Sequence, residues 1–330
     1  MKVTGAIRVA GAVQLLPGVL HLPPARSPAG ARGGTGTPVD VVQRRLSGPQ
    51  MAQQVTVSAL DQAGLAAEQV QLLLLASGFD NGDEWRLAPF HLARACGAVR
   101  ATVLGLQQMS SGGAAGVEHA VARMIADPAV QHAVVVAGDS FAGLPAEHWT
   151  SASGEGVALE DGAAAVVLSR TVPGRLHVRA VTSCGASMVS LPATSDAAPA
   201  DRRPADGGTV KEHLAHALEM RRLISTAIRR ALDDIGTEPG DPSIASVRLP
   251  RLGQPFLRAA VLPALPPDLR AKVSTAGQDT GHLGAGDLLA DLATLHAEEP
   301  SGVRVSLLLS LGTGMTASCV VVQNTGALLS

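Results

Sequence analysis

The sequence predicts a mixed α/β protein whose strands are covered by helices on both faces. Short apolar runs of strand length alternate with amphipathic helical patterns, and glycines often mark where these elements end. Hydrophobic residues make up 46% of the 330 residues and charged residues 16%, so the chain can bury a sizeable core. Continuous apolar runs are typical of strands buried on both faces, which places the protein in the α/β class.

Helical and strand patterns follow one another closely in the first half. Apolar side chains at helical spacing span residues 49–66 and lead into the apolar run 70–78, which ends at a glycine and predicts a buried strand. The tight turn at Glu160, Asp161 and Gly162 predicts the start of a later strand. The further predicted elements are a loop and short helix at 79–100, a strand at 101–108, a helix at 112–126, and strands at 132–140 and 162–170.

The second half follows a polar stretch, residues 195–209, whose Pro, Gly and Asp content predicts a linker or exposed loop. A long amphipathic helix is predicted over 212–236 and ends at a glycine. The remaining predictions are a strand and its exit at 245–253, a helix at 285–299, and a strand, glycine turn and strand within 303–323. Both halves run helix, buried strand, glycine-bearing turn and closing strand, which favours a weak internal duplication.

Composition argues against several classes of function. No run of about 18 apolar residues is present, so no membrane-spanning helix is predicted, and no signal peptide is expected at the N-terminus. The net charge is −2, no basic cluster is present and tyrosine is absent, so the sequence gives no sign of a nucleic-acid-binding surface. Cys96, Cys184 and Cys319 lack metal-site spacing and fit a reducing compartment, so we expect a cytoplasmic protein with no metal site.

The stretch QQMSSGGAAGVEHAV, residues 107–121, places Ser110 and Ser111 at the mouth of a predicted helix that has little bulk. A helix N-terminus offers free N–H groups and a positive dipole end, which together favour anions. A serine at this position is most often an N-cap. It can also be a nucleophile, provided that a nearby group takes its proton.

The order of the motifs resembles that of the thiolase superfamily, and within it of β-ketoacyl-ACP synthase III-like enzymes. LEDGAAAVVLS resembles the family's GDGA turn, with Glu160 in place of glycine, and LGTGMTASCVVV resembles its C-terminal glycine loop. The resemblance implies a five-layered α/β/α/β/α thiolase fold with two pseudo-repeated halves and a homodimer. The halves are expected at 1–170, with the nucleophile, and at 171–330. The other matching pieces, all within 50–325, are QMAQQVTVSALDQAGLAAEQVQLLLLASG, the serine turn and HAVVVAGDS.

Three functional positions of that family are changed in this chain. The family nucleophile is a cysteine; an alignment without gaps places Ser110 there, and a shift of one residue places Ser111 there. The family's HQAN histidine has no counterpart in LPRLGQP, residues 249–255. The family's GNTSAAS stretch reads GHLGAGD, so His282 stands for the asparagine and Asp287 for the last serine.

The three changes make chemical sense together. A thiol with a pKa of about 8.5 becomes a thiolate in a helix dipole, whereas a serine needs a general base within hydrogen-bond reach. The resemblance and this chemistry imply Ser110 as nucleophile, His282 as base and then acid, and Asp287 as the group that orients His282. The backbone N–H groups of Ser110 and Gly314 are expected to bind the oxyanion, Gly314 by its position in the glycine loop.

The pattern resembles most closely a subgroup of polyketide pathways, the serine-nucleophile starter-unit synthases and acyltransferases. It implies transfer of a short acyl group from a CoA or carrier-protein thioester, through acyl-Ser110, to a carrier-protein thiol, a hydroxyl or an amine. The expected partners are acyl-CoA and an acyl carrier protein, with no cofactor, nucleic acid or membrane. Three alternatives stay open: a ketosynthase that condenses acyl-CoA with malonyl-ACP, a non-catalytic starter-specificity partner of a synthase, and a thioesterase.

Overall fold

Strands and helices alternate along the chain in the computed structural model, which describes residues 1–16, 46–78, 87–141, 159–186, 210–274, 280–298, 302–312 and 314–326. The strands are β1 (Arg8–Leu15), β2 (Leu72–Ala76), β3 (Thr102–Leu106), β4 (His132–Asp139), β5 (Gly162–Ser169), β6 (Leu176–Gly185), β7 (Ile244–Arg248), β8 (Val273–Ser274), β9 (Arg304–Gly312) and β10 (Thr316–Asn324). The helices are α1 (Gly48–Ala63), α2 (Ala88–Cys96), α3 (Gly112–Ala126), α4 (Val210–Ile235), α5 (Gln254–Phe256), α6 (Pro267–Arg270) and α7 (Asp287–Ala297).

The strands form one ten-stranded sheet, in the order β3-β2-β4-β5-β1-β6-β10-β9-β7-β8, which consists of two five-stranded halves of the same topology. Counted from its outer edge, each half has two parallel pairs followed by two antiparallel pairs. The halves join where Arg8 and Val9 of β1 pair with His177 and Leu176 of β6. The predicted division between residues 170 and 171 falls in the loop between β5 and β6, and the assignment of two domains stays a prediction.

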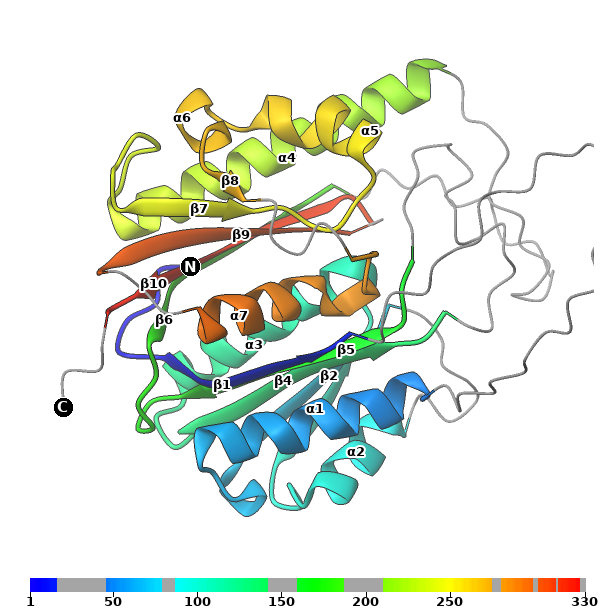
Figure 1. Cartoon of the computed structure of the whole chain (residues 1–330), viewed down its shortest axis with the longest axis vertical. Helices are drawn as coiled ribbons and strands as arrows, with labels where there is room; N and C mark the ends of the chain where they lie inside the picture. The colour runs from blue at the N-terminus through cyan, green and yellow to red at the C-terminus, as the bar shows by residue number, and fades with distance from the viewer. Residues whose placement is uncertain are drawn as a thin grey trace, which may run out of the picture.

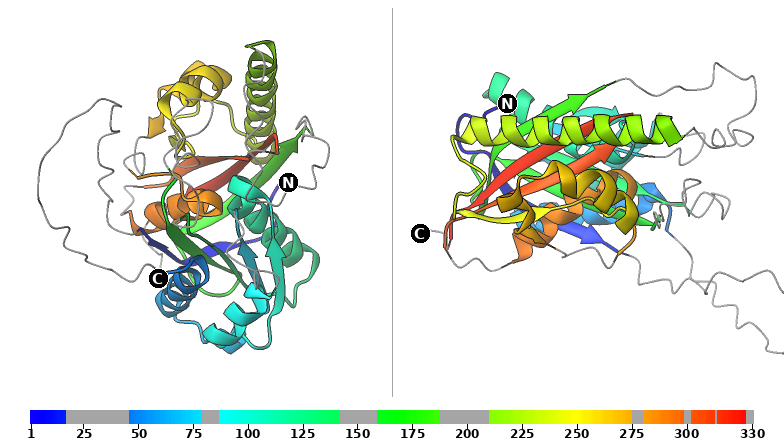
Figure 2. Two further views of the ribbon diagram at one scale, coloured as in Figure 1. Left: turned by 90° about the vertical axis from the view of Figure 1, so that its right-hand side faces the viewer. Right: turned by 90° about the horizontal axis from the view of Figure 1, so that it is seen from above.

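Five layers are visible in Figure 1, as the resemblance predicted. Helices α1 and α2 cover the outer face of the first half-sheet, α3 and α7 lie between the two half-sheets, and α4 to α6 cover the second. Figure 2 shows α4 lying along the outer face, over β6 and β10. Because α7 is enclosed on both sides, all of its residues from Asp287 to Ala293 are buried, and such a helix is apolar around most of its circumference.

Three strands, β1, β6 and the two-residue β8, are absent from the sequence prediction. Strand β6 alternates buried residues with exposed ones such as Arg179, and β1 carries a central glycine, so neither presents a long apolar run. The helix predicted over 49–66 ends at Ala63, because Gly64 adopts a left-handed φ of 63° and closes it. Among the described residues, no helix combines the length and apolar character needed to cross a membrane. The predicted loop at 195–209 lies outside the described residues.

Candidate active site

Ser110 lies in the turn that connects β3 to α3. A short 3₁₀ helix over Met109–Ser111 makes this turn, and Met109 adopts a left-handed φ of 49°. That conformation costs a non-glycine residue about 1–2 kcal/mol, and such strain is concentrated at functional sites. The Oγ atom of Ser110 lies 2.7 Å from Nε2 of His282, 172 residues later in the chain.

Ser111 faces elsewhere. Its side chain is buried, and its hydroxyl donates a hydrogen bond to the carbonyl oxygen of Gln108 at 2.8 Å. Ser111 occupies the N-cap position of α3 but makes no capping hydrogen bond through its side chain. The structure therefore brings Ser110, and not Ser111, to His282.

His282 and Asp287 form a buried pair. The imidazole Nδ1 lies 2.5 Å from Oδ2 of Asp287, and because an ionised carboxylate only accepts hydrogen bonds, Nδ1 is the donor. In the neutral imidazole, Nε2 is then the acceptor, so the hydroxyl of Ser110 donates to it. The second oxygen of Asp287 accepts a hydrogen bond from the backbone N–H of Leu283 at 2.8 Å, which fixes the carboxylate in the turn before α7.

Each member of the pair shifts the pKa of the other. Burial acts to lower the pKa of His282, but the charge and hydrogen bond of Asp287, helped by the charge of Asp139, outweigh it and raise that pKa. Burial acts to raise the pKa of Asp287, but His282 and Arg251 outweigh it and lower that pKa. The arrangement therefore keeps Asp287 ionised and stabilises an imidazolium at His282.

The segment 281–286 is held by two acidic residues of the first half. Asp139, fully buried at the end of β4, accepts hydrogen bonds from the backbone N–H of Ala285 at 2.9 Å and of Gly78 at 3.0 Å. Glu160 donates its backbone N–H to the carbonyl oxygen of His282 at 3.0 Å, and its carboxylate accepts from the N–H of Gly281 at 2.6 Å. These residues were not predicted as part of the site, although the departure at position 160 and an acid at the end of a buried strand were visible in the sequence.

Small residues allow the serine turn and the histidine segment to meet. A Cβ atom at Gly113 would lie 2.5 Å from the carbonyl oxygen of Ala285, so only glycine permits this approach at the N-terminus of α3. The lack of bulk in the serine turn thus has a packing reason.

Gly314 lies in the turn between β9 and β10. This turn adjoins the serine turn, because a Cβ atom at Gly312 would lie 2.5 Å from Oγ of Ser111, and the hydroxyl of Ser310 donates to the carbonyl oxygen of Ser110 at 3.4 Å. Gly314 itself is exposed, and its neighbour at position 313 lies outside the described residues. The roles of Ser110 and Gly314 in oxyanion binding stay predictions.

A third buried group, Arg251, contacts the same carboxylate. Its backbone N–H donates to Oδ2 of Asp287 at 3.1 Å, and its Nη1 donates to the carbonyl oxygen of Asp287 at 2.9 Å. Its Nη2 lies 3.2 Å from the buried carboxylate of Asp291. Arg251 falls in the stretch 249–255 that lacks the family histidine, but its contacts depend on chain segments far apart in the sequence and were not predicted. Among the described residues, no cluster of three His, Cys, Asp or Glu side chains is arranged to hold a metal ion.

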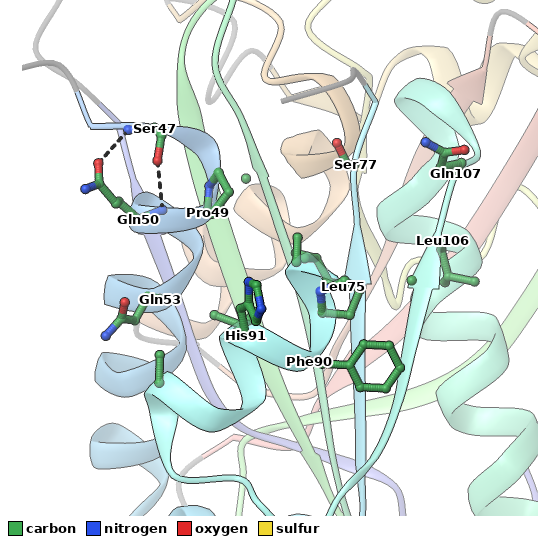
Figure 3. Close-up of a pocket in the computed structure, with 16 residues that line it drawn as sticks. Ser47, Pro49, Gln50, Gln53, Leu75, Ser77, Phe90, His91, Leu106 and Gln107 are labelled. Atoms are coloured by element: carbon green, nitrogen blue, oxygen red, sulfur yellow. Dashed lines mark hydrogen bonds between the residues drawn. The ribbon is translucent and has the colours of Figure 1, made fainter. Parts of the chain in front are cut away.

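A cavity of about 650 Å³ lies between α1, α2 and the ends of β2 and β3, and its lining includes Gln107, which precedes the serine turn, but not Ser110 or His282. Figure 3 shows Ser77 and Gln107 at the strand ends, with Phe90 and His91 on α2 and Ser47 at the N-terminal end of α1. Ser77 also donates a hydrogen bond to Asp139, which binds the backbone of Ala285 in the His282 segment as well. Asp139 therefore connects the cavity wall to that segment. None of the described lining residues carries a permanent charge, and most of the lining is apolar.

Neither a family model nor a curated protein sequence matches the chain, but solved structures do. ChlB3, described as an acyltransferase, is 24% identical over 97% of this chain and 98% of its own, with a TM-score of 0.75. A cysteine-to-serine variant of Xanthomonas campestris OleA, with bound lauric acid and lauroyl-CoA, is 18% identical over 96% of this chain and 98% of its own, with a TM-score of 0.68. FabH of Xanthomonas oryzae pv. oryzae, a 3-oxoacyl-(acyl carrier protein) synthase III, is 18% identical over 98% of this chain and 99% of its own, with a TM-score of 0.67. The resemblance to synthase III-like enzymes of the thiolase superfamily is thereby confirmed for the fold.

Proposed function

We propose that this protein is an acyltransferase that carries a short acyl group on Ser110. The donor is an acyl-CoA or an acyl carrier protein thioester, and the acceptor is a carrier-protein thiol or a hydroxyl or amine of a natural-product intermediate. One observation carries the proposal: the Ser110 hydroxyl lies 2.7 Å from the His282 imidazole, which lies 2.5 Å from the Asp287 carboxylate, and the imidazole and the carboxylate are buried. This is the nucleophile–base–orienter geometry that activates a serine.

The proposed reaction has two transfers. As Oγ of Ser110 attacks the thioester carbonyl, its proton moves to Nε2 of His282, and the Asp287 carboxylate stabilises the imidazolium that forms. The C–S bond then breaks, and the Nε2 proton passes to the departing sulfur. In the second transfer the acceptor gives its proton to Nε2 and attacks the carbonyl carbon of the acyl-serine. The bond between that carbon and Oγ of Ser110 then breaks, and the Nε2 proton returns to Oγ.

Proteins with the same fold support this choice of reaction and donor. ChlB3 is described as an acyltransferase, and the OleA variant in which serine replaces a cysteine holds lauric acid and lauroyl-CoA. None of the described residues that line the cavity between α1 and α2 carries a permanent charge, which fits an acyl chain or a neutral amide better than an anion. We therefore propose acyl-CoA as the first donor to test.

Intact-protein mass spectrometry after incubation with a series of acyl-CoAs tests the proposal. The wild-type protein is expected to gain the mass of one acyl group, and Ser110→Ala to gain none. Ser111→Ala is the matched control, because it removes the neighbouring hydroxyl that bonds to Gln108 and should still acquire the adduct. An adduct that persists in Ser110→Ala would overturn the proposal.

A condensing reaction is the second candidate, because FabH, which shares the fold, is a 3-oxoacyl synthase. That reaction in the resembling family uses a histidine and an asparagine, which this chain replaces within 249–255 and at His282. Incubation with acyl-CoA and malonyl-ACP separates the two functions: a β-ketoacyl-ACP with release of CO₂ identifies a ketosynthase, and acyl transfer without CO₂ identifies an acyltransferase.

A further inference from the structure

Arg251 is enclosed in the protein and meets two carboxylates. Its side chain is 1% exposed, and its Nη1 lies 3.6 Å from Oδ1 of Asp287 while its Nη2 lies 3.2 Å from Asp291, itself 4% exposed. The third nitrogen, Nε, donates to the hydroxyl of Thr280 at 2.9 Å. The guanidinium thus joins the segment before His282 to the first two turns of α7.

The position of Arg251 matters for His282 through charge. The charged groups around the imidazole are Asp287 from α7, Asp139 from β4 and Arg251 from the segment after β7, and Glu160 binds the adjacent Gly281. The two aspartates favour the imidazolium, whereas Arg251 disfavours it. A base that stayed protonated at neutral pH would be unable to accept a proton from Ser110.

We propose that Arg251 is a positioning residue for the site: it fixes the Asp287 carboxylate that orients His282, and its positive charge opposes the protonation of the imidazole that the two aspartates favour. The inference rests on the proposed function for its catalytic meaning. Its geometric part concerns only Arg251, Asp287 and His282, and is testable without any acyl transfer.

The decisive measurement is the titration of the His282 imidazole by NMR, with its signal assigned by its loss in His282→Gln. Arg251→Met removes the opposing cation, so the midpoint is expected to rise, and Ser110 acylation at pH 7 to fall by at most about tenfold for each pH unit of that rise. At higher pH the acylation rate should recover toward that of the wild type. A role limited to packing would lower the rate at every pH and leave the midpoint in place.

Arg248 offers a matched control. It is also a buried arginine, at the end of β7, but it pairs with Glu298 and makes no described contact with Asp287. Arg248→Met should leave the midpoint of His282 unchanged even where it lowers stability. Arg251→Met leaves the buried Asp291 without its arginine partner, so the same change is also made in the Asp291→Asn variant. There the midpoint of His282 is expected to show the same upward shift relative to Asp291→Asn alone.

The outcomes separate the two proposals. An unchanged His282 midpoint in a folded protein lacking Arg251, in either background, would overturn the role of Arg251. Failure of wild-type Ser110 to accept any acyl group would overturn the proposed function, and the NMR titration would still decide whether Arg251 sets the charge state of His282.

Discussion

Asp291 shows how burial competes with charge pairing at a single residue. Although Arg251 lies 3.2 Å away, burial outweighs this contact and raises the pKa of Asp291 to about 7. The ordinary pKa of an aspartate is about 4, so between pH 4 and 7 the folded protein holds a proton that the unfolded chain releases. By linkage, this group makes folding less favourable as pH rises through that interval.

We therefore predict a pH-dependent effect of Asp291→Asn. The free energy of unfolding of the wild type, relative to the variant, should fall as pH rises from about 4 to about 7, by at most about 1.4 kcal/mol per pH unit, and level off above. Urea unfolding at a series of pH values measures the difference. A difference that is constant with pH, or that grows toward neutral pH, would contradict the raised pKa.

The individual site residues differ in how far the sequence foretells them. Ser110, His282 and Asp287 were singled out because each stands at a position that a motif marks and carries a changed side chain. Arg251 and Asp139 carry no such mark. Arg251 reaches Asp287 over 36 residues and Asp139 reaches Ala285 over 146, so their importance depends on distances that only the folded chain defines.

At the scale of elements, the turn before α7 depends on a glycine. Gly284 adopts a left-handed φ of 60°, and a Cβ atom there would overlap the Oδ2 atom of Asp139. Asp139 holds this turn through Ala285, so displacing its carboxylate should also displace His282. Both the backbone conformation and the close approach therefore require glycine.

Gly284→Ala and Gly236→Ala form a matched pair. Gly236 closes α4 with a similar φ of 66°, but nothing lies within 4 Å of its missing Cβ, so alanine there introduces backbone strain alone. We predict a loss of about 1 kcal/mol of stability for Gly236→Ala, and a further loss of about 1–3 kcal/mol for Gly284→Ala through overpacking. Chemical denaturation measures both. Equal losses in the two variants would show that the contact with Asp139 is not restrictive.

Helices and strands were predictable where the spacing of apolar residues and the residues that mark an element's ends indicate the same boundaries. The helix at 112–126 coincides with its prediction, and the strands at 132–139 and 162–169 lie within one residue of theirs. The strand and exit predicted at 245–253 correspond to β7, which ends at Arg248, and to the following residues, where Pro250 and Gly253 interrupt the extended chain. Strands β1 and β6 join the two half-sheets, and their pairing is a property of the assembled sheet rather than of local pattern.

At the scale of the whole molecule, the candidate site depends on both half-sheets. The first contributes Ser110, Asp139 and Glu160, and the second contributes His282 and Asp287 together with Arg251. The N-terminal ends of α3 and α7, the two helices between the half-sheets, bring these groups together (Figure 1). Each half holds only part of this arrangement, the serine or the imidazole–carboxylate pair, so the proposed chemistry depends on the junction between the halves.

The outer edge of the first half-sheet supports the expected homodimer. Strand β3 is an edge strand, and unlike β8 at the other edge, which has two residues, it spans five residues that are mostly exposed. Exposed apolar side chains gather on β3 and α2: Leu104 is 44% exposed and Phe90 is 56% exposed. A long apolar edge invites pairing with another chain, and a second copy of the same edge would extend the sheet.

We predict that the protein in solution has twice the chain mass of 33.5 kDa, and that Leu104→Lys shifts it toward the monomer. A lysine on each copy would place like charges in the middle of the interface, which disfavours strand pairing. Size-exclusion chromatography with light scattering measures the mass. Leu214→Lys is the control, because Leu214 is 56% exposed on α4, which covers the opposite half-sheet, and should leave the mass unchanged. A monomeric wild type, or a dimer that only Leu214→Lys disrupts, would place the interface elsewhere or remove it.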